Sequence, residues 1–301
     1  MRPETEILEL VLNFARSRDD IRVVVMNGSR VNPDAKKDPF QDYDIACYVL
    51  DVAPYRGDQR IPPMFGEILI LQTPEDMGDP PPEDDGFYSF LMQFRDGSRI
   101  DLSFHPLEKV AKIPDDSLSL VLLDKDGCVP ALPPPSDRSY LPQKPTAKEF
   151  ADCCNEFWWL NPYAAKGLWR GELTYARYML DTLMRGELLK MLKWYFGVNT
   201  NFEKSPGKLG KYLKSGLEPE LWALLEKTYA DAGEEHTWDA LYTMDSLFRQ
   251  AALVVAGAFG FPYPEGDGAR VSAFIRQIQA LPRDAEADAV TFDAAASGTG
   301  R

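Results

Sequence analysis

The stretch Gly28-Ser29-Arg30, followed along the chain by Asp42-Tyr43-Asp44-Ile45-Ala46-Cys47-Tyr48-Val49, indicates the fold of the N-terminal half. Successive side chains of a strand point to opposite faces, so Asp42 and Asp44 are expected to share one face. Two carboxylates this close repel unless a cation lies between them, and Mg²⁺ is the usual partner of hard oxygen ligands and substrate phosphates. A third acid, Asp101 in Arg-Ile-Asp-Leu-Ser-Phe, is expected on a neighbouring strand. The pattern predicts phosphoryl or nucleotidyl transfer.

The length and composition predict two packed domains in a soluble, cytoplasmic protein. The chain has 301 residues, of which 45% are hydrophobic, and typical domain sizes favour two cores. The charged start, Met1–Glu6, has no apolar signal region, and the apolar stretch Ala251–Phe261 is too short to span a bilayer. The cysteines have neither zinc-ligand spacing nor a disulfide framework, which favours a reducing compartment; they are Cys47, Cys128, Cys153 and Cys154.

The formal net charge of −14 argues against a nucleic-acid partner, because such proteins neutralise phosphates with Lys and Arg. A polycationic small molecule is the better substrate prediction. The simpler alternative is that the acidity serves solubility alone. With only two histidines, His105 and His236, the chain has little basis for a histidine-rich metal site or a Ser-His-Asp scheme.

The N-terminal part reads as a mixed α/β domain, which we place at residues 1–135. Periodic residues after Pro3 predict a helix to Phe14, and an Asp96-Gly97 dipeptide predicts a hairpin turn between two strands. Apolar runs predict strands at 21–26, 43–50, 67–72, 87–94 and 98–104, residues 107–112 look helical, and 118–123 fit either a helix or a strand.

Prolines between Pro130 and Pro145 mark a domain boundary, because they are too frequent for a helix or a central strand. Thr146 and Glu149 form a predicted capping box at the start of a helical bundle, which we place at residues 136–284. Helices are predicted over 147–160, 173–196, 209–214, 219–229 and 238–259. An Ala/Ser/Gly-rich tail, 285–301, is predicted to be disordered. The fold class is therefore α+β.

The Gly28-Ser29 pair suits a phosphate-binding turn. Glycine lets the backbone approach a phosphate closely, Ser29 supplies a hydroxyl, and Arg30 adds positive charge. Each motif alone also fits a purely structural role, since most Gly-Ser pairs are ordinary turns and most Asp-x-Asp strings lie in solvated loops. The order of turn, paired aspartates and a lone acid on the next strand is nevertheless the pattern of the nucleotidyltransferase fold.

Longer motifs resemble the aminoglycoside 6-adenylyltransferases that modify streptomycin. The resemblance covers residues 1 to about 265 and rests most specifically on Asp152-Cys-Cys-Asn-Glu-Phe-Trp158 and Pro162-Tyr-Ala-Ala-Lys-Gly-Leu168. The chain departs from the family at Asn27, where a Glu is expected. Because Asn27 lies outside the metal-binding pair, we expect the change to affect local hydrogen bonding only.

The resemblance implies transfer of AMP from ATP to a hydroxyl of streptomycin, most specifically the 6-hydroxyl, and thereby antibiotic resistance. Asp42 and Asp44 would hold Mg²⁺ against the phosphates, and Asp101 would take the proton of the acceptor hydroxyl and also touch a second metal. The alternative for Asp101 is a simple ion pair with Arg99 or a neighbouring lysine at a strand edge.

The helical domain is expected to supply cations for the ATP phosphates and acids for the antibiotic. Lys190 and Lys208, with Lys166 as a third candidate, correspond best to the phosphate-binding residues of related enzymes, although each could be an ordinary solvated lysine. Streptomycin carries two guanidinium groups and an amine, which suit carboxylates and aromatic faces. The candidates on the first helices after the linker are Glu156, Trp158, Trp159, Glu172, Tyr175 and Asp181, of which Glu156 and Glu172 are preferred.

Three alternatives stay open at this point. At least one of the adjacent tryptophans Trp158 and Trp159 should belong to the bundle core, since neighbours on a helix point about 100° apart. The acceptor could be a polynucleotide or a protein side chain, and the module could bind nucleotide without catalysis. We expect a monomer, because no heptad run suggests association.

Overall fold

The computed structural model describes residues 1–286 and contains two compact units, Met1–Ser139 and a second that begins at Tyr140. The division lies inside the proline-rich stretch between Pro130 and Pro145. Of the tail predicted to be disordered, residues 287–301 lie outside the described part of the chain.

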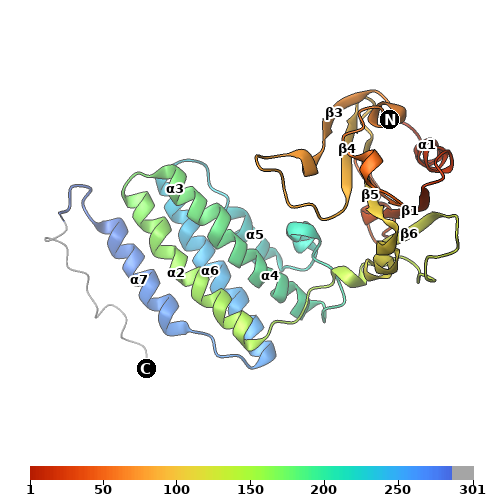
Figure 1. Cartoon of the computed structure of the whole chain (residues 1–301). Coiled ribbons are helices and arrows are strands. Elements are labelled where there is room, and N and C mark those ends of the chain that lie inside the picture. The colour runs from red at the N-terminus through yellow and green to blue at the C-terminus, as the bar shows by residue number, and fades with distance from the viewer. Residues whose placement is uncertain (287–301) are drawn as a thin grey trace. The chain divides into compact units, whose positions relative to one another are not determined.

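The N-terminal unit is built on a six-stranded mixed sheet with the order β3-β4-β5-β2-β1-β6 (Figure 1). Only the central pair β2 and β5 is parallel, and the other neighbours are antiparallel. The segment that fitted either a helix or a strand is the edge strand β6. The strands are β1 (Ile21–Asn27), β2 (Tyr43–Val49), β3 (Ile68–Gln72), β4 (Tyr88–Phe94), β5 (Arg99–Pro106) and β6 (Ser119–Asp124).

Both faces of the central strands are covered, which explains their nearly continuous apolar sequences. Helix α1 (Glu4–Arg16) buries Ile7, Val11 and Phe14, spaced four and three residues apart, in the main core of the sheet. On the opposite face, Val23 and Val25 of β1 pack in a smaller cluster with the 3₁₀ segment η5 (Leu107–Asp115). The helical prediction for 107–112 was therefore correct in position, although the segment winds as a 3₁₀ helix.

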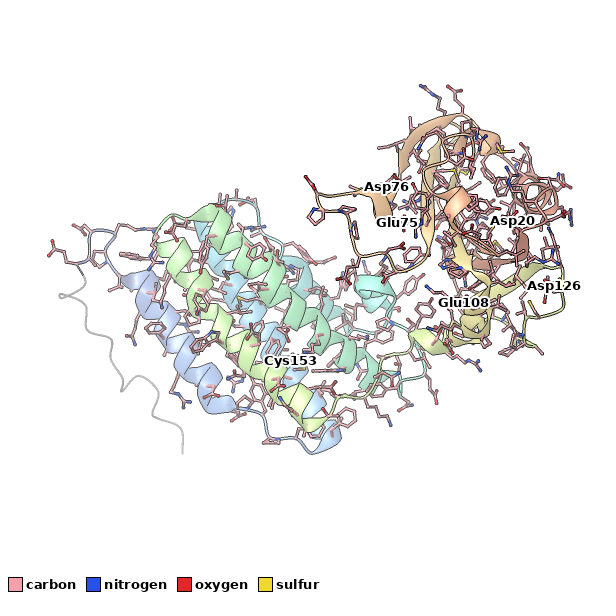
Figure 2. The ribbon with its side chains drawn as sticks, viewed as in Figure 1. Asp20, Glu75, Asp76, Glu108, Asp126 and Cys153 are labelled. Carbon is pink, nitrogen blue, oxygen red and sulfur yellow. The ribbon has the colours of Figure 1, made fainter. Side chains whose placement is uncertain are left out.

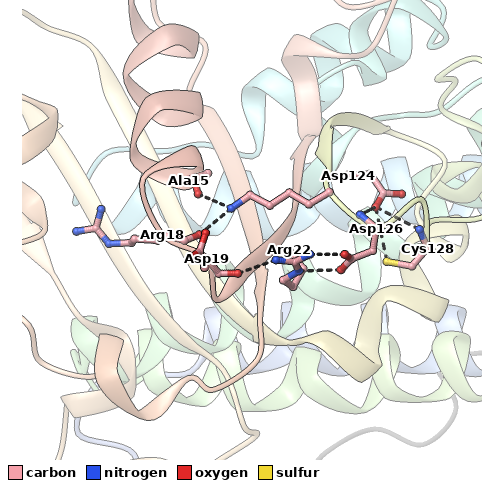
Figure 3. A network of polar contacts seen from close by, with 8 residues as sticks. Ala15, Arg18, Asp19, Arg22, Asp124, Asp126 and Cys128 are labelled. Atoms are coloured by element: carbon pink, nitrogen blue, oxygen red, sulfur yellow. Dashed lines mark hydrogen bonds and ion pairs between the residues drawn. The ribbon is translucent and has the colours of Figure 1, made fainter.

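Polar contacts fasten the end of β6 to the turn between α1 and β1 (Figure 3). The ammonium group of Lys125 donates hydrogen bonds to the carbonyl oxygens of Ala15 (3.0 Å), in the last turn of α1, and of Arg18 (2.7 Å), just after the helix. The guanidinium of Arg22 pairs with the Asp126 carboxylate, with Nε at 2.7 Å from Oδ2. A cation at the C-terminus of a helix satisfies its last carbonyls and its dipole, so these contacts fix the edge of the sheet.

The C-terminal unit is a helical bundle that begins with α2 (Figure 1). Thr146 and Glu149 form the predicted capping box, with each side chain bonded to the other's backbone N–H. The predicted helix 173–196 is continuous but contains a π-helical segment in its middle. The elements are α2 (Ala147–Trp169), α3 (Leu173–Tyr178), η7 (Met179–Met184), α4 (Arg185–Asn199), η8 (Lys208–Gly210), η9 (Leu213–Ser215), α5 (Pro219–Lys227), α6 (Glu234–Phe259) and α7 (Glu265–Ala280).

Two features of the bundle differ from the prediction. The helix predicted over 209–214 is replaced by two short 3₁₀ turns, because Gly207, Leu209 and Gly210 all have positive φ. Helix α7 follows Phe259 where no further helix was predicted, and it buries Ile275 and Ile278.

The bundle core is aromatic and sulfur-rich. Phe157 of α2 stacks on Phe248 of α6 with ring centroids 3.8 Å apart. Cys153 lies among these helices (Figure 2) and is buried with Cys154, and all four cysteines are free. Within residues 1–286, no helix combines the length and the apolar composition that crossing a membrane requires.

Candidate active site

A polar row crosses the middle of the N-terminal sheet. Asp44 of β2 lies opposite Asp101 of the parallel strand β5 and opposite Asn27 of the antiparallel strand β1. Opposed residues of neighbouring strands share a face, so these three side chains belong to the same side of the sheet. Asp42 lies just before the first residue of β2. The fold thus brings together the three acids that the sequence singled out, although Asp101 is far from Asp44 along the chain.

The Gly-Ser turn packs directly against this row. Gly28 begins the 3₁₀ turn η1 (Gly28–Arg30) with φ of +77°, a conformation that favours glycine. A Cβ placed on Gly28 would lie 2.1 Å from Oδ2 of Asp44. Glycine is therefore required here both by the backbone conformation and by the close approach of the Asp44 carboxylate.

Arg99 joins two of the three acids. Its guanidinium donates two hydrogen bonds to Asp101, from Nε and Nη2, both at 2.8 Å. The same group reaches Asp42, with 3.6 Å between Nε and Oδ2. The ion pair that we considered as the alternative role of Asp101 is therefore present, and it holds the Asp101 carboxylate in a fixed bidentate geometry.

The pKa of Asp42 is raised above its ordinary value. Desolvation is the largest cause, and the negative charge of Asp101 adds to it, whereas Arg99 and Arg30 act in the opposite direction. The positive charges of Arg99 and Arg30 therefore do not fully offset the desolvation of the half-buried Asp42 carboxylate. A cation placed among these oxygens would stabilise the ionised form, and hard carboxylate oxygens are the donors that Mg²⁺ prefers.

Among the described residues, no group of three or more Asp, Glu, His or Cys side chains is gathered into a metal-ligand cluster. The chemistry of Asp42 and Asp44 nevertheless fits a magnesium ion, because both supply oxygen ligands and one is desolvated.

Arg30 lies beside the Gly-Ser turn and makes several contacts within the N-terminal unit. Its guanidinium donates to Glu4 (2.9 Å) and to the carbonyl of Gln41 (2.8 Å), and it lies 3.6 Å above the ring of Tyr43. Glu4 offsets part of its charge, and the binding of a phosphate by Arg30 stays a prediction. Arg30 also braces the segment from the Gly-Ser turn to β2, and the Ser29 carbonyl accepts a further bond from the Gln41 side chain (3.1 Å).

The predicted lysines of the helical unit are exposed. Lys166 of α2 lies 6.0 Å from the ring of Phe274, and Lys190 of α4 donates to Glu187 at 3.4 Å. Lys208 begins the 3₁₀ turn η8 immediately after the positive-φ residue Gly207. Their exposure is compatible with phosphate binding and equally with ordinary solvation.

Trp158 belongs to the bundle core and is only 3% exposed, as expected for one of the two adjacent tryptophans, and its contact with the substrate stays a prediction. Its neighbour Trp159 is 62% exposed. The preferred acid Glu156 is also exposed, and Glu156, Trp159, Tyr163 and Lys166 recur at helical spacing along one face of α2. Glu156 and Trp159 are therefore both accessible on α2, and their contact with a cationic substrate stays a prediction.

Of the three remaining substrate candidates, Asp181 lies in η7 and pairs with Arg177 (2.7 Å) and Arg185 (3.1 Å). The other two lie at the start of α3. Glu172 is exposed, and its carboxylate is 3.9 Å from Nη1 of Arg170. Tyr175 is 38% exposed, and its ring packs so closely on Gly167 of α2 that a Cβ there would lie 2.9 Å from the ring.

Sequence reasoning did not give Arg99 or Asn27 an active role. The signal for Arg99 was its spacing of two residues before Asp101, which places both side chains on one face of a strand. Asn27 donates to the Ser119 hydroxyl at 2.7 Å and so extends the polar row to β6. This contact agrees with the expectation that its departure from the family pattern affects local hydrogen bonding.

Comparisons with known proteins identify the family of this chain. A family model described as "Streptomycin adenylyltransferase" matches residues 1–278. An aminoglycoside 6-adenylyltransferase of Campylobacter jejuni is 40% identical over 278 residues, 92% of this chain and 96% of that protein. The Bacillus subtilis protein of the same name is 37% identical over 269 residues, 89% of this chain and 95% of that one.

A solved structure of an aminoglycoside 6-adenyltransferase from Bacillus subtilis is 32% identical, covers 93% of this chain and 100% of that one, and has a TM-score of 0.47. The match of the family model over nearly the whole described chain, together with relatives at this identity and coverage, decides the family. The chain belongs to the streptomycin adenylyltransferase family.

Proposed function

We propose that the protein is an aminoglycoside 6-adenylyltransferase that moves AMP from ATP to the 6-hydroxyl of streptomycin and so confers resistance to this antibiotic. The observation that carries the proposal is the row of Asp44 and Asp101 on paired strands, beside Asp42 and against the Gly28 turn, in a chain of this family. Relatives that match most of this chain bear the name aminoglycoside 6-adenylyltransferase, which supports the reaction class.

Asp42 and Asp44 are the proposed ligands of Mg²⁺. The ion would neutralise charge on the ATP phosphates during transfer. The raised pKa of Asp42 supports this assignment, because its desolvated carboxylate gains most from a cation. Gly28 contributes by leaving space for the Asp44 carboxylate, and the turn that follows offers its backbone and the Ser29 hydroxyl to a phosphate.

Asp101 is the proposed general base. The acceptor oxygen attacks the α-phosphorus, its proton passes to the Asp101 carboxylate, and the bond from the α-phosphorus to the bridging oxygen breaks to release pyrophosphate. Arg99 would act as a positioning residue, since its bidentate contact orients the Asp101 carboxylate.

Residues of both charge signs on the helical unit are proposed to bind the two substrates. Lys166, Lys190 and Lys208 are the proposed partners of the ATP phosphates. Glu156, Glu172 and Tyr175, joined by Trp159, would receive the guanidinium groups of streptomycin through charge pairing and cation–π contact. The net charge of −14 suits a polycationic antibiotic and disfavours nucleic acid. We further propose a monomer that acts in the cytoplasm, where its free thiols stay reduced.

Mass spectrometry of streptomycin incubated with the protein, ATP and Mg²⁺ tests the reaction. The expected product is streptomycin plus one adenylyl group, located at the 6-hydroxyl by NMR and absent when EDTA replaces Mg²⁺. A parallel measurement of the streptomycin concentration that inhibits an expressing strain tests resistance. Absence of any adenylylated product from folded protein would exclude this antibiotic as the substrate.

A further inference from the structure

A polar cavity lies within the helical unit and is lined by residues of α6 and α7 and by Trp158 of α2. Its volume is about 610 Å³, which is within the range of small-molecule sites. Helix α7 comes close to the indole at Gly268, where a Cβ would lie 2.9 Å from the ring. Aromatic side chains, Trp158, Tyr242 and Tyr263, form much of the lining.

Asp245 of α6 lines this cavity and is 6% exposed. Neither of its carboxylate oxygens has a hydrogen-bond partner among residues 1–286. The indole N–H of Trp158 and the hydroxyl of Tyr263 also line the cavity and are buried; they interact with each other and have no further polar partner in the described part of the chain. Buried polar atoms in native proteins are nearly always paired, so the Asp245 carboxylate, which has only the Asn161 amide beside it, indicates a missing ligand.

The charged groups around the cavity do not satisfy Asp245. Arg249 lies 4.0 Å from Glu265, and both side chains are more than half exposed. Arg276 of α7 is exposed, with its guanidinium 5.7 Å from the centre of the Tyr242 ring. Burial raises the pKa of Asp245 to about 8, and the neighbouring Asn161 amide and the Arg276 charge oppose this only in part. The cavity therefore contains one buried acid, Asp245, that no neighbouring cation pairs with closely.

We propose that this cavity is a second binding site, separate from the Asp42–Asp44–Asp101 row, for a small organic cation whose ammonium or amidinium group pairs with Asp245. A planar amidinium offers two N–H donors that match both carboxylate oxygens. The body of such a ligand would lie against the aromatic rings of Trp158 and Tyr263, where cation–π attraction and apolar burial add to the ion pair. The inference stands on the helical unit alone and goes beyond the proposed transferase reaction.

Titration calorimetry with benzamidine on the full chain tests the proposal, and benzamide serves as the neutral probe of the same shape. We expect wild-type protein to bind benzamidine and not benzamide. The nearly isosteric variant Asp245→Asn is expected to weaken benzamidine binding at least tenfold. The matched variant Asp239→Asn, which changes an exposed acid of the same helix, is expected to leave it unchanged.

Two further variants test the position of the benzamidine site independently of Asp245→Asn. Ser272 of α7 lines the cavity, so Ser272→Trp would fill it with an indole while Asp245 stays unchanged. This variant is expected to block benzamidine binding and provides a test even if Asp245→Asn fails to fold. Asp44→Asn is expected to bind benzamidine normally, which separates this site from the transferase site. The proposal is overturned if folded wild-type protein does not bind benzamidine, or if binding survives both Asp245→Asn and Ser272→Trp. Adenylylation assays of these two cavity variants should show wild-type turnover, so loss of one function is distinguishable from loss of the other.

Discussion

Replacing Gly28 with alanine probes the contact between the Gly-Ser turn and the acidic row. The new methyl carbon would lie 2.1 Å from Oδ2 and 3.1 Å from Cγ of Asp44, far inside van der Waals contact. The turn is held by the Arg30 contacts with Glu4 and Gln41, so the Asp44 carboxylate is the group expected to move. A displacement of at least about 1 Å is needed to restore an ordinary contact distance.

Gly28→Ala is expected to lower both the Tm and the rate of adenylylation, for separate reasons. A left-handed conformation costs a non-glycine residue about 1–2 kcal/mol, which corresponds to a fall in Tm of roughly 2–8 °C for a chain of this size. Misplacing a group at the reaction centre by about 1 Å can cost on the order of 100-fold in rate. We therefore expect Gly28→Ala to remain folded, with a modestly lower Tm and kcat/KM for streptomycin adenylylation reduced at least about 100-fold.

Gly57 provides the matched control, because it also has a positive φ, +66°, while nothing lies within 4 Å of its Cβ position. Gly57→Ala is expected to show the same loss of Tm with nearly wild-type turnover. Steady-state adenylylation and thermal unfolding monitored by circular dichroism measure both quantities. Wild-type turnover in Gly28→Ala, or equal losses of turnover in the two variants, would refute the proposed contact between this turn and a catalytic Asp44.

Three further predictions follow from the site and from the cavity of the helical unit. Asp44→Asn is expected to abolish adenylylation detected by mass spectrometry without lowering Tm by more than a few degrees, and retained turnover would contradict its assignment as a metal ligand. Because Arg99 lowers the pKa of Asp42, Arg99→Gln should raise that pKa further and move the acidic limb of the kcat/KM profile to higher pH; an unmoved limb would argue against ionised Asp42 as a requirement. The pKa of Asp245 is raised from 3.8 to about 8 in the folded chain, so its contribution to stability is complete below about pH 4 and is lost as the pH rises to about 8. The Tm of the wild-type protein should therefore fall more between pH 5 and pH 8.5 than that of Asp245→Asn, and parallel curves from calorimetry would show that Asp245 does not titrate in this range.

The local features of the site and fold could be predicted because their signals lie within a few residues. Alternation in the run after Asp42 identified β2, Asp96-Gly97 identified the hairpin between β4 and β5, and Thr146 with Glu149 identified the start of α2. The missed helix α7 has weaker signals, since Gly266 and Gly268 lie in its first turn and glycine is a poor helix former.

Local patterns in the chain predict three acids in strand-forming frames near a glycine turn, and a proline-rich linker before a helical segment. The tertiary structure is needed to show that β2 and β5 are parallel neighbours with Asp44 opposite Asp101, because strand register depends on pairing between distant segments. It also shows that Arg99 binds Asp101, that Glu4 pairs with Arg30, and that Trp158 is buried while Trp159 is exposed. Adjacent residues on a helix differ by about 100° in direction, and the neighbours that pack against the helix select which of them becomes core.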